Sequence, residues 1–115
     1  MKKTFQLTLP MCPTDNHIYG QKGKIRFMYK EAKEWKADAQ RDAKLLWKKK
    51  PLKEELWADI TFYVARDRDV HGSGKLIMDS LQGLIYDDDK QFTHVSFHKM
   101  KDKENSRVHI VIGEI

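Results

Sequence analysis

Apolar residues recur at every second position in some stretches of this chain and at every third or fourth position in others. The first period is typical of strands, whose successive side chains point to opposite faces, and the second of helices with one apolar stripe. Residues 4–9 and 57–65 alternate, which predicts two half-buried strands. Residues 28–49 repeat at helical spacing, so we expect a long helix that Pro51 ends.

Further elements follow from the same patterns. Residues 10–24 carry two prolines and two glycines among polar residues, which predicts a loop. A second, shorter helix is expected over residues 75–85, with Ser73 as its N-cap. Residues 92–99 and 107–112 are expected to form an antiparallel hairpin.

These elements define a fold class. Val95 and Phe97 should face inward from the first strand of the hairpin. The order is β-α-β-α-β-β, which predicts one small α/β (α+β) domain over residues 1–115, with a mixed sheet and two helices. A chain of 115 residues leaves little room for a second domain.

Composition excludes several classes of protein. No apolar run approaches the roughly 18 residues that span a bilayer, so no membrane association is expected. The N-terminus lacks a long apolar segment and alternates at once, which favours a strand over a signal peptide. Cys12 is the single cysteine, which rules out an internal disulfide and fits a reducing cytoplasm. We interpret it as a structural thiol.

Charge is divided unevenly along the chain. Residues 1–53 hold 14 Lys and Arg against 5 Asp and Glu, whereas residues 54–115 hold 8 against 12. The basic half suggests a polyanionic partner and the acidic half a place for cations. A solvated helix face is an equally good interpretation of the basic half.

Acidic residues stand at both ends of the second expected helix. Asp69 and His71 lie two positions apart in an extended segment, so both can point the same way. Asp87, Asp88 and Asp89 follow the helix. Carboxylates that are brought together need a cation, and a metal there can activate water against a phosphodiester. Taken alone, the Asp87–Asp89 run also fits a solvated acidic turn.

Lys75 is placed at the start of the expected second helix, where the dipole favours anions. This unfavourable position suggests a use, such as contact with a scissile phosphate beside free backbone N–H groups. A surface ion pair with Asp79 is the alternative. The stretch Gly72–Lys75 lacks the glycine spacing of a P-loop, so no nucleotide cofactor is expected.

Three motifs in order resemble the RusA-type Holliday-junction resolvases over nearly the whole chain. Residues 9–19, with Pro10, Pro13, Asn16 and Tyr19, resemble that family's opening segment. Residues 68–81 resemble its Asp-x-Asp-Asn-x-x-Lys motif and the helix that follows. Residues 83–91 resemble its segment ending in Asp-Asp-x-Gln.

The resemblance implies a metal-dependent endonuclease that makes paired nicks across four-way DNA junctions in recombination and repair. It places Asp69, His71 and Asp89 at the metal-binding, catalytic positions, with Asp88 as the neighbouring acid and Lys75 as the essential lysine. It implies a homodimer, because two nicks on opposite strands need two symmetric sites. Such a protein would be cytoplasmic and associated with the nucleoid when acting, and either chromosomal or phage-encoded.

His71 departs from the motif, which has aspartate at this position, and Gly72 stands where the motif has asparagine. Three roles stay open for His71. Imidazole can ligate a metal and shift preference from Mg²⁺ toward Mn²⁺, with activity falling as it protonates. It can act as the general base on water. Alternatively, cleavage is impaired and the chain is a module that binds structured nucleic acid.

If the resemblance holds, we expect the basic half of the chain to bind the phosphates of the DNA backbone, contacts that position DNA but do not recognise its sequence. Tyr19 is the expected contact to the branch point. The remaining expected DNA-binding residues lie in the first loop, on the first helix and at the start of the second, and are Asn16, Lys22, Lys24, Arg26, Lys30, Lys33 and Lys75.

Overall fold

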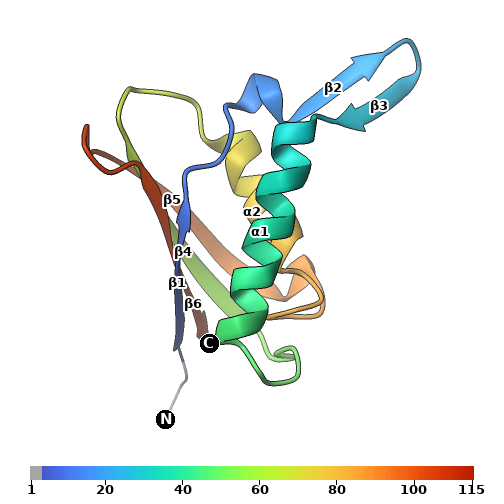
Figure 1. Cartoon of the computed structure of the whole chain (residues 1–115). Helices are drawn as coiled ribbons and strands as arrows, with labels where there is room; N and C mark the ends of the chain where they lie inside the picture. Colours follow the sequence, from blue (N-terminus) through green and yellow to red (C-terminus); the bar gives the residue numbers. More distant parts are fainter. Residues whose placement is uncertain (1–3) are drawn as a thin grey trace.

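The computed structural model describes residues 4–115, so the first three residues of the expected domain lie outside the described part. The chain forms two helices and a mixed sheet, as expected (Figure 1). In chain order the elements are β1 (Thr4–Pro10), η1 (Asp15–His17), β2 (Tyr19–Lys22), β3 (Ile25–Met28), α1 (Lys30–Leu46), β4 (Leu56–Val64), α2 (His71–Leu81), η2 (Asp89–Gln91), β5 (Phe92–Lys101) and β6 (Arg107–Glu114).

The main sheet has four strands in the order β1-β6-β4-β5. Strand β6 runs antiparallel to β1 and β4, whereas β5 runs parallel to β4. Every second residue of β4 is buried, as the alternation of residues 57–65 predicts. The sheet contributes to the core Leu7, Leu9, Leu56, Ala58, Ile60, Phe62, Val64, Val108, Ile110 and Ile112.

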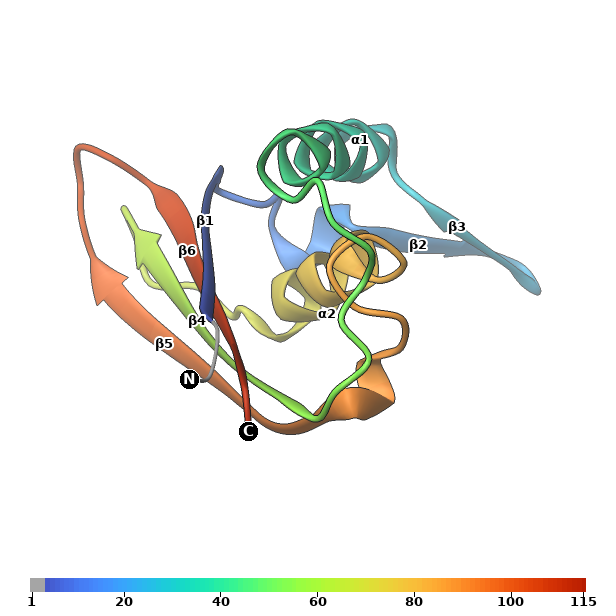
Figure 2. The same ribbon diagram turned by 90° about the horizontal axis from the view of Figure 1, so that it is seen from below.

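Both helices cover the apolar face of this sheet (Figure 2). Helix α1 buries small residues, Ala32, Ala39 and Ala43, together with Trp35, which allows it to approach closely. Trp35 also donates from Nε1 to the carbonyl of Pro10, 3.0 Å away, and so ties α1 to the end of β1. Helix α2 buries Leu76, Ile77 and Leu81.

The expected hairpin of residues 92–99 and 107–112 is wrong in its pairing. Both strands exist, but β4 lies between β5 and β6, and β5 joins the sheet through the parallel unit β4-α2-β5. Alternation tells which face of a strand is buried but not which strand lies beside it. Val95 and Phe97 share the helix-facing side with Ala58 and Ile60, yet remain 39% and 38% exposed because β5 is an edge strand.

The expected loop over residues 10–24 is also wrong in part. It contains the short helix η1 and strand β2, which pairs with β3 into a two-stranded hairpin that projects from the body (Figure 1). Gly23 forms the turn with a φ of 62°, a conformation that favours glycine. Few hairpin residues are buried, so they lack the apolar pattern that marks a strand.

The bounds of both helices differ from expectation. Helix α1 ends at Leu46, before Pro51, because Trp47 adopts an extended backbone conformation, and its ring packs edge-on against Phe5 with the ring centres 5.4 Å apart. Helix α2 begins at His71 and not at residue 75, so Ser73 lies inside it. Within residues 4–115, no helix is long and apolar enough to cross a membrane.

Cys12 is buried in the core, which confirms a structural thiol. Burial raises the pKa of Cys12 to about 12, so the thiol stays protonated at neutral pH.

Candidate active site

The N-terminus of α2 is capped by two carboxylates from outside the helix. Asp69 Oδ1 accepts the backbone N–H of His71 at 3.1 Å. Asp15, from η1, accepts the N–H groups of Gly72 and Ser73 at 3.1 and 3.2 Å. Anions are stabilised at a helix N-terminus, which explains why α2 begins several residues before its expected start.

This capping corrects the expected role of the helix N-terminus. Lys75 lies in the second turn of α2, and the three N–H groups that we expected to be free are bound by Asp15 and Asp69. The N–H groups of His71, Gly72 and Ser73 are therefore not free to join Lys75 in contacting a phosphate.

Arg68 holds the first loop against this helix. Its guanidinium donates to the carbonyls of Cys12 and Pro13 at 2.9 and 2.7 Å, and to Ser73 Oγ at 2.8 Å. Asp15 reaches the helix because the loop is held there. The loop after β1, η1 and the start of α2 are thus joined beside Asp69.

Asp69 and His71 form a close pair. Nδ1 of His71 lies 2.6 Å from Oδ1 of Asp69, and both side chains are exposed. The backbone N–H of His71, followed by its ring, lowers the pKa of Asp69. A carboxylate on Nδ1 fixes the orientation of an imidazole and leaves Nε2 as the nitrogen for a ligand or a proton.

An open groove of about 350 Å³ runs between α2 and β5. His71, Lys75 and Asp79 line it at intervals of four residues, which places them along one face of α2. Gly74 completes the helix side, and Phe97 lies so close to it that a side chain at position 74 would overlap the ring. The remaining lining residues are Met78, Asp89, Phe92 and Val95.

Tyr19 links the β2–β3 hairpin to this groove. Its hydroxyl donates to Asp79 Oδ2 at 3.4 Å, and Nζ of Lys75 lies 5.5 Å from the centre of its ring. The guanidinium of Arg26 lies 4.8 Å from the same ring centre. Burial and the charge of Asp79 raise the pKa of Tyr19, so the hydroxyl remains a donor.

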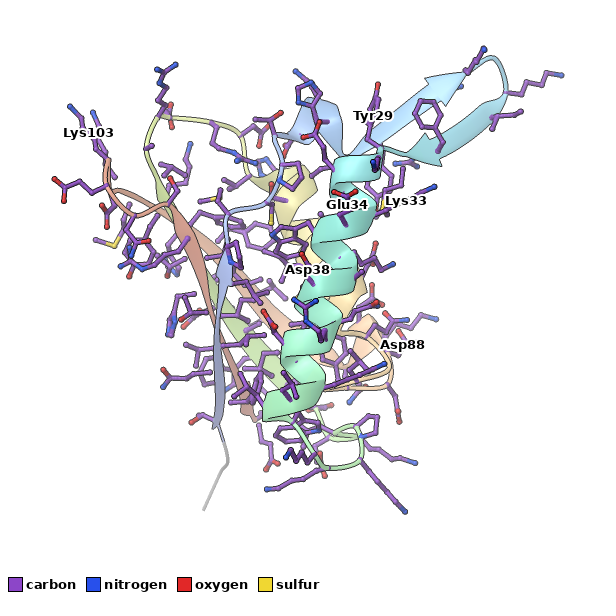
Figure 3. All side chains as sticks on the ribbon, viewed as in Figure 1. Tyr29, Lys33, Glu34, Asp38, Asp88 and Lys103 are labelled. Carbon is purple, nitrogen blue, oxygen red and sulfur yellow. The ribbon has the colours of Figure 1, made fainter. Side chains whose placement is uncertain are left out.

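The acidic loop after α2 is held by Gln91. Its side-chain oxygen accepts the N–H groups of Asp87 and Asp88, while its side-chain nitrogen donates to the carbonyls of Leu52 and Glu54. Gln91 therefore anchors this loop (Figure 3 labels Asp88 there) to the segment before β4.

Asp88 and Asp89 shift each other's pKa in opposite directions. A side-chain hydrogen bond to Asp88 raises the pKa of Asp89, and burial and the charge of Asp79 act in the same direction. The N–H of Lys90 and the same side-chain bond lower the pKa of Asp88. Carboxylates in this relation repel when both are ionised, and a proton or a cation relieves the repulsion.

The expected site residues therefore fall into two groups. Asp69 with His71 stands at the start of α2, and Asp88 with Asp89 follows its end, while His71 and Asp89 line the same groove. Over residues 4–115, no three His, Cys, Asp or Glu side chains gather closely enough to hold a metal ion. The two groups stand apart because α2, at about 1.5 Å per residue, separates them.

Of the expected DNA-binding residues, Lys75 lines this groove, and the others lie on the β2–β3 hairpin, the start of α1 and η1. Lys22, Lys24 and Arg26 are exposed on the projecting hairpin, and Lys30 and Lys33 are exposed on the first turn of α1. Asn16, on η1, lines a second hollow together with Asp69 and Asp15. Their contacts with DNA remain predictions.

Asp15 and Arg68 are candidate functional residues that sequence reasoning missed, and it considered Asp79 only as a surface ion-pair partner of Lys75. Asp79 carried a signal, because its spacing of four from Lys75 places both side chains on one helix face. Asp15 and Arg68 act across more than fifty residues of sequence, so no local pattern marks them.

A small α+β domain with a groove that carries imidazole, ammonium and carboxylate groups has the side chains of an enzyme that hydrolyses phosphate esters. The chain matches the family model described as Endodeoxyribonuclease RusA over residues 9–113, nearly its whole length. It therefore belongs to the RusA family of endodeoxyribonucleases, which hydrolyse phosphodiester bonds in Holliday junctions. The resemblance and the enzyme class predicted from the sequence are confirmed. No curated protein matched the chain in a sequence search.

Proposed function

We propose that this endodeoxyribonuclease is a homodimer that depends on a divalent metal and resolves four-way junctions by paired nicks. The observation that supports it is the groove in which α2 aligns His71, Lys75 and Asp79 beside Asp89. The proposed location is the cytoplasm, on the nucleoid.

The donors present fit a divalent cation. His71 presents Nε2 because Asp69 occupies Nδ1. The side-chain hydrogen bond to Asp88 and the nearby carboxylate charges raise the pKa of Asp89, and a cation would relieve the repulsion between these carboxylates. We propose that Asp69, His71 and Asp89 bind the metal, which requires the two groups at the ends of α2 to come closer together than they lie in this structure, with Asp88 and Asp79 as neighbouring acids. A bound Mg²⁺ or Mn²⁺ supplies charge stabilisation to a phosphodiester under attack, and the imidazole favours Mn²⁺.

Lys75 is proposed to contact the scissile phosphate. It is exposed at the groove, where its Nζ lies 5.5 Å from the centre of the Tyr19 ring, and the Tyr19 hydroxyl is in turn bound to Asp79. An ammonium in this position stabilises the charge that develops on the phosphate oxygens. Lys22, Lys24, Arg26, Lys30 and Lys33 are proposed to position the DNA arms.

A cleavage assay on a synthetic four-way junction tests the proposal, with Mg²⁺, Mn²⁺ and no metal in parallel. Asp69→Asn should abolish nicking and leave junction binding largely intact. Asp67→Asn is the matched control, because that exposed carboxylate pairs with Lys99 outside the groove. Asp69→Asn cutting as fast as the parent would refute the proposed site. Binding without nicking by the parent would instead favour a module that only binds junctions.

A further inference from the structure

The β2–β3 hairpin has two different faces. Residues opposite each other in an antiparallel pair share a face, so Tyr19 and Met28 lie on one side together with the pair Gln21 and Arg26. This inner side is anchored, since the Tyr19 hydroxyl binds Asp79 of α2. The hairpin is thereby fixed relative to the groove.

The outer side carries a row of apolar side chains that are exposed or partly exposed. Ile25 is 70% exposed, and Phe27 and Tyr29 are each 38% exposed. The rings of Phe27 and Tyr29 meet edge to face, 5.1 Å apart. Gly20 is the cross-strand partner of Phe27, and the Phe27 ring lies over the Gly20 backbone. A Cβ at position 20 would lie only 2.4 Å from this ring. The Phe27 ring can occupy this position only because residue 20 has no side chain.

Cations border the same face. Lys22 is the cross-strand partner of Ile25 and shares its side, and Lys24 stands in the turn. Lys33 lies close to Tyr29 where the hairpin meets α1 (Figure 3). Among the ion pairs within residues 4–115, none involves these three lysines. The β2–β3 hairpin therefore presents aromatic rings between lysines at its tip and a lysine at its base, and none of these lysines forms an ion pair within the described residues.

We propose that Phe27 and Tyr29 form a platform on which unpaired bases at the branch point of the junction stack. Exposed rings flanked by lysines match the chemistry of a nucleic acid with accessible bases, because the rings take the base faces and the lysines the phosphates. Bases inside a duplex are already stacked and paired, whereas at the branch point the faces of some bases are accessible for stacking. The platform thus gives preference for a junction over linear duplex. This inference rests on the proposed function.

The test measures binding to a four-way junction and to a linear duplex of equal length, without metal so that no strand is cut. 2-Aminopurine placed at the branch point reports stacking by its fluorescence, and the same base within one arm serves as reference. Phe27→Ala should weaken junction binding about 5- to 100-fold, remove the fluorescence change at the branch and leave duplex binding unchanged. Phe27→Trp should restore both signals.

Leu45→Ala is the matched control, because Leu45 is 64% exposed on α1, away from the hairpin. Junction binding by Phe27→Ala that equals the parent's, or that falls equally with duplex binding, overturns the platform. Loss of the dimer in Phe27→Ala also overturns it and assigns this face to a second copy of the chain. If the parent protein cuts junctions and Phe27→Ala binds them as tightly as the parent, the stacking platform is refuted and the proposed function is not. If the parent protein does not cut junctions and binds them no more tightly than linear duplex, the proposed function and the platform are both refuted.

Discussion

Gly74→Ala tests whether the groove between α2 and β5 is built as described. Gly74 lies inside α2, where glycine is about 1 kcal/mol less favourable than alanine. Propensity alone therefore predicts that the alanine variant is more stable. The ring of Phe97 opposes this, because a Cβ at position 74 would lie 2.4 Å from Cζ and 2.8 Å from two further ring atoms.

The size of the opposing effect follows from these distances. Carbon atoms pack at about 3.5–4.0 Å, so the ring would have to retreat by about 1 Å. It cannot retreat freely, because it also packs edge-on against Phe62, with ring centres 6.0 Å apart. Overpacking of this kind costs about 1–3 kcal/mol. With the propensity gain subtracted, we expect a net loss of about 1 kcal/mol, or a fall in melting temperature of about 4 °C.

A double-mutant cycle with Phe97→Ala isolates the contact. Without the ring, Gly74→Ala should recover its propensity gain and stabilise the chain by about 1 kcal/mol. The coupling free energy between the two positions is then about 2 kcal/mol, measured by urea unfolding of the four proteins. A coupling below about 0.5 kcal/mol, or a Gly74→Ala variant more stable than the parent, would show that Phe97 does not lie against α2.

Three further predictions concern the first loop and the groove. Because burial raises the pKa of Cys12 from 9.0 to about 12, the folded chain keeps a proton that the unfolded chain loses. The free energy of unfolding should therefore fall as the pH rises above 9.0, and this fall should be smaller in Cys12→Ala, in which only other groups such as Tyr19 contribute, compared by urea unfolding across that range. Tyr19→Phe removes the hydroxyl from Asp79 but keeps the ring near Lys75, so junction cleavage should fall less than in Tyr19→Leu; equal losses would contradict a role for the ring. His71→Asp should raise the cleavage rate with Mg²⁺ relative to Mn²⁺, and an unchanged ratio would exclude His71 as a metal ligand.

The sequence predicted the elements whose apolar residues follow a regular period. Strand β4 alternates because one face meets the helices, and α1 shows its stripe because one side meets the sheet. The same patterns did not predict strand order, since β4 separates β5 from β6 and the period of a strand contains no information about its neighbour. The β2–β3 hairpin was missed because it buries too little surface to need a pattern.

The candidate site divides in the same way. Asp69, His71, Lys75, Asp88 and Asp89 stand in local motifs, so their residue types and spacing could be recognised along the chain. The sequence by itself thus determined which chemical groups are present and the family to which the chain belongs.

Only the tertiary structure decided how those groups are arranged. Asp15 caps α2 from a segment that is distant in sequence. The helix therefore begins at His71, four residues before the predicted start, and Lys75 lies in its second turn. Tyr19 joined the hairpin to Asp79 across the fold. Contacts between residues far apart in sequence depend on packing and loop closure, which leave no periodic trace in either segment.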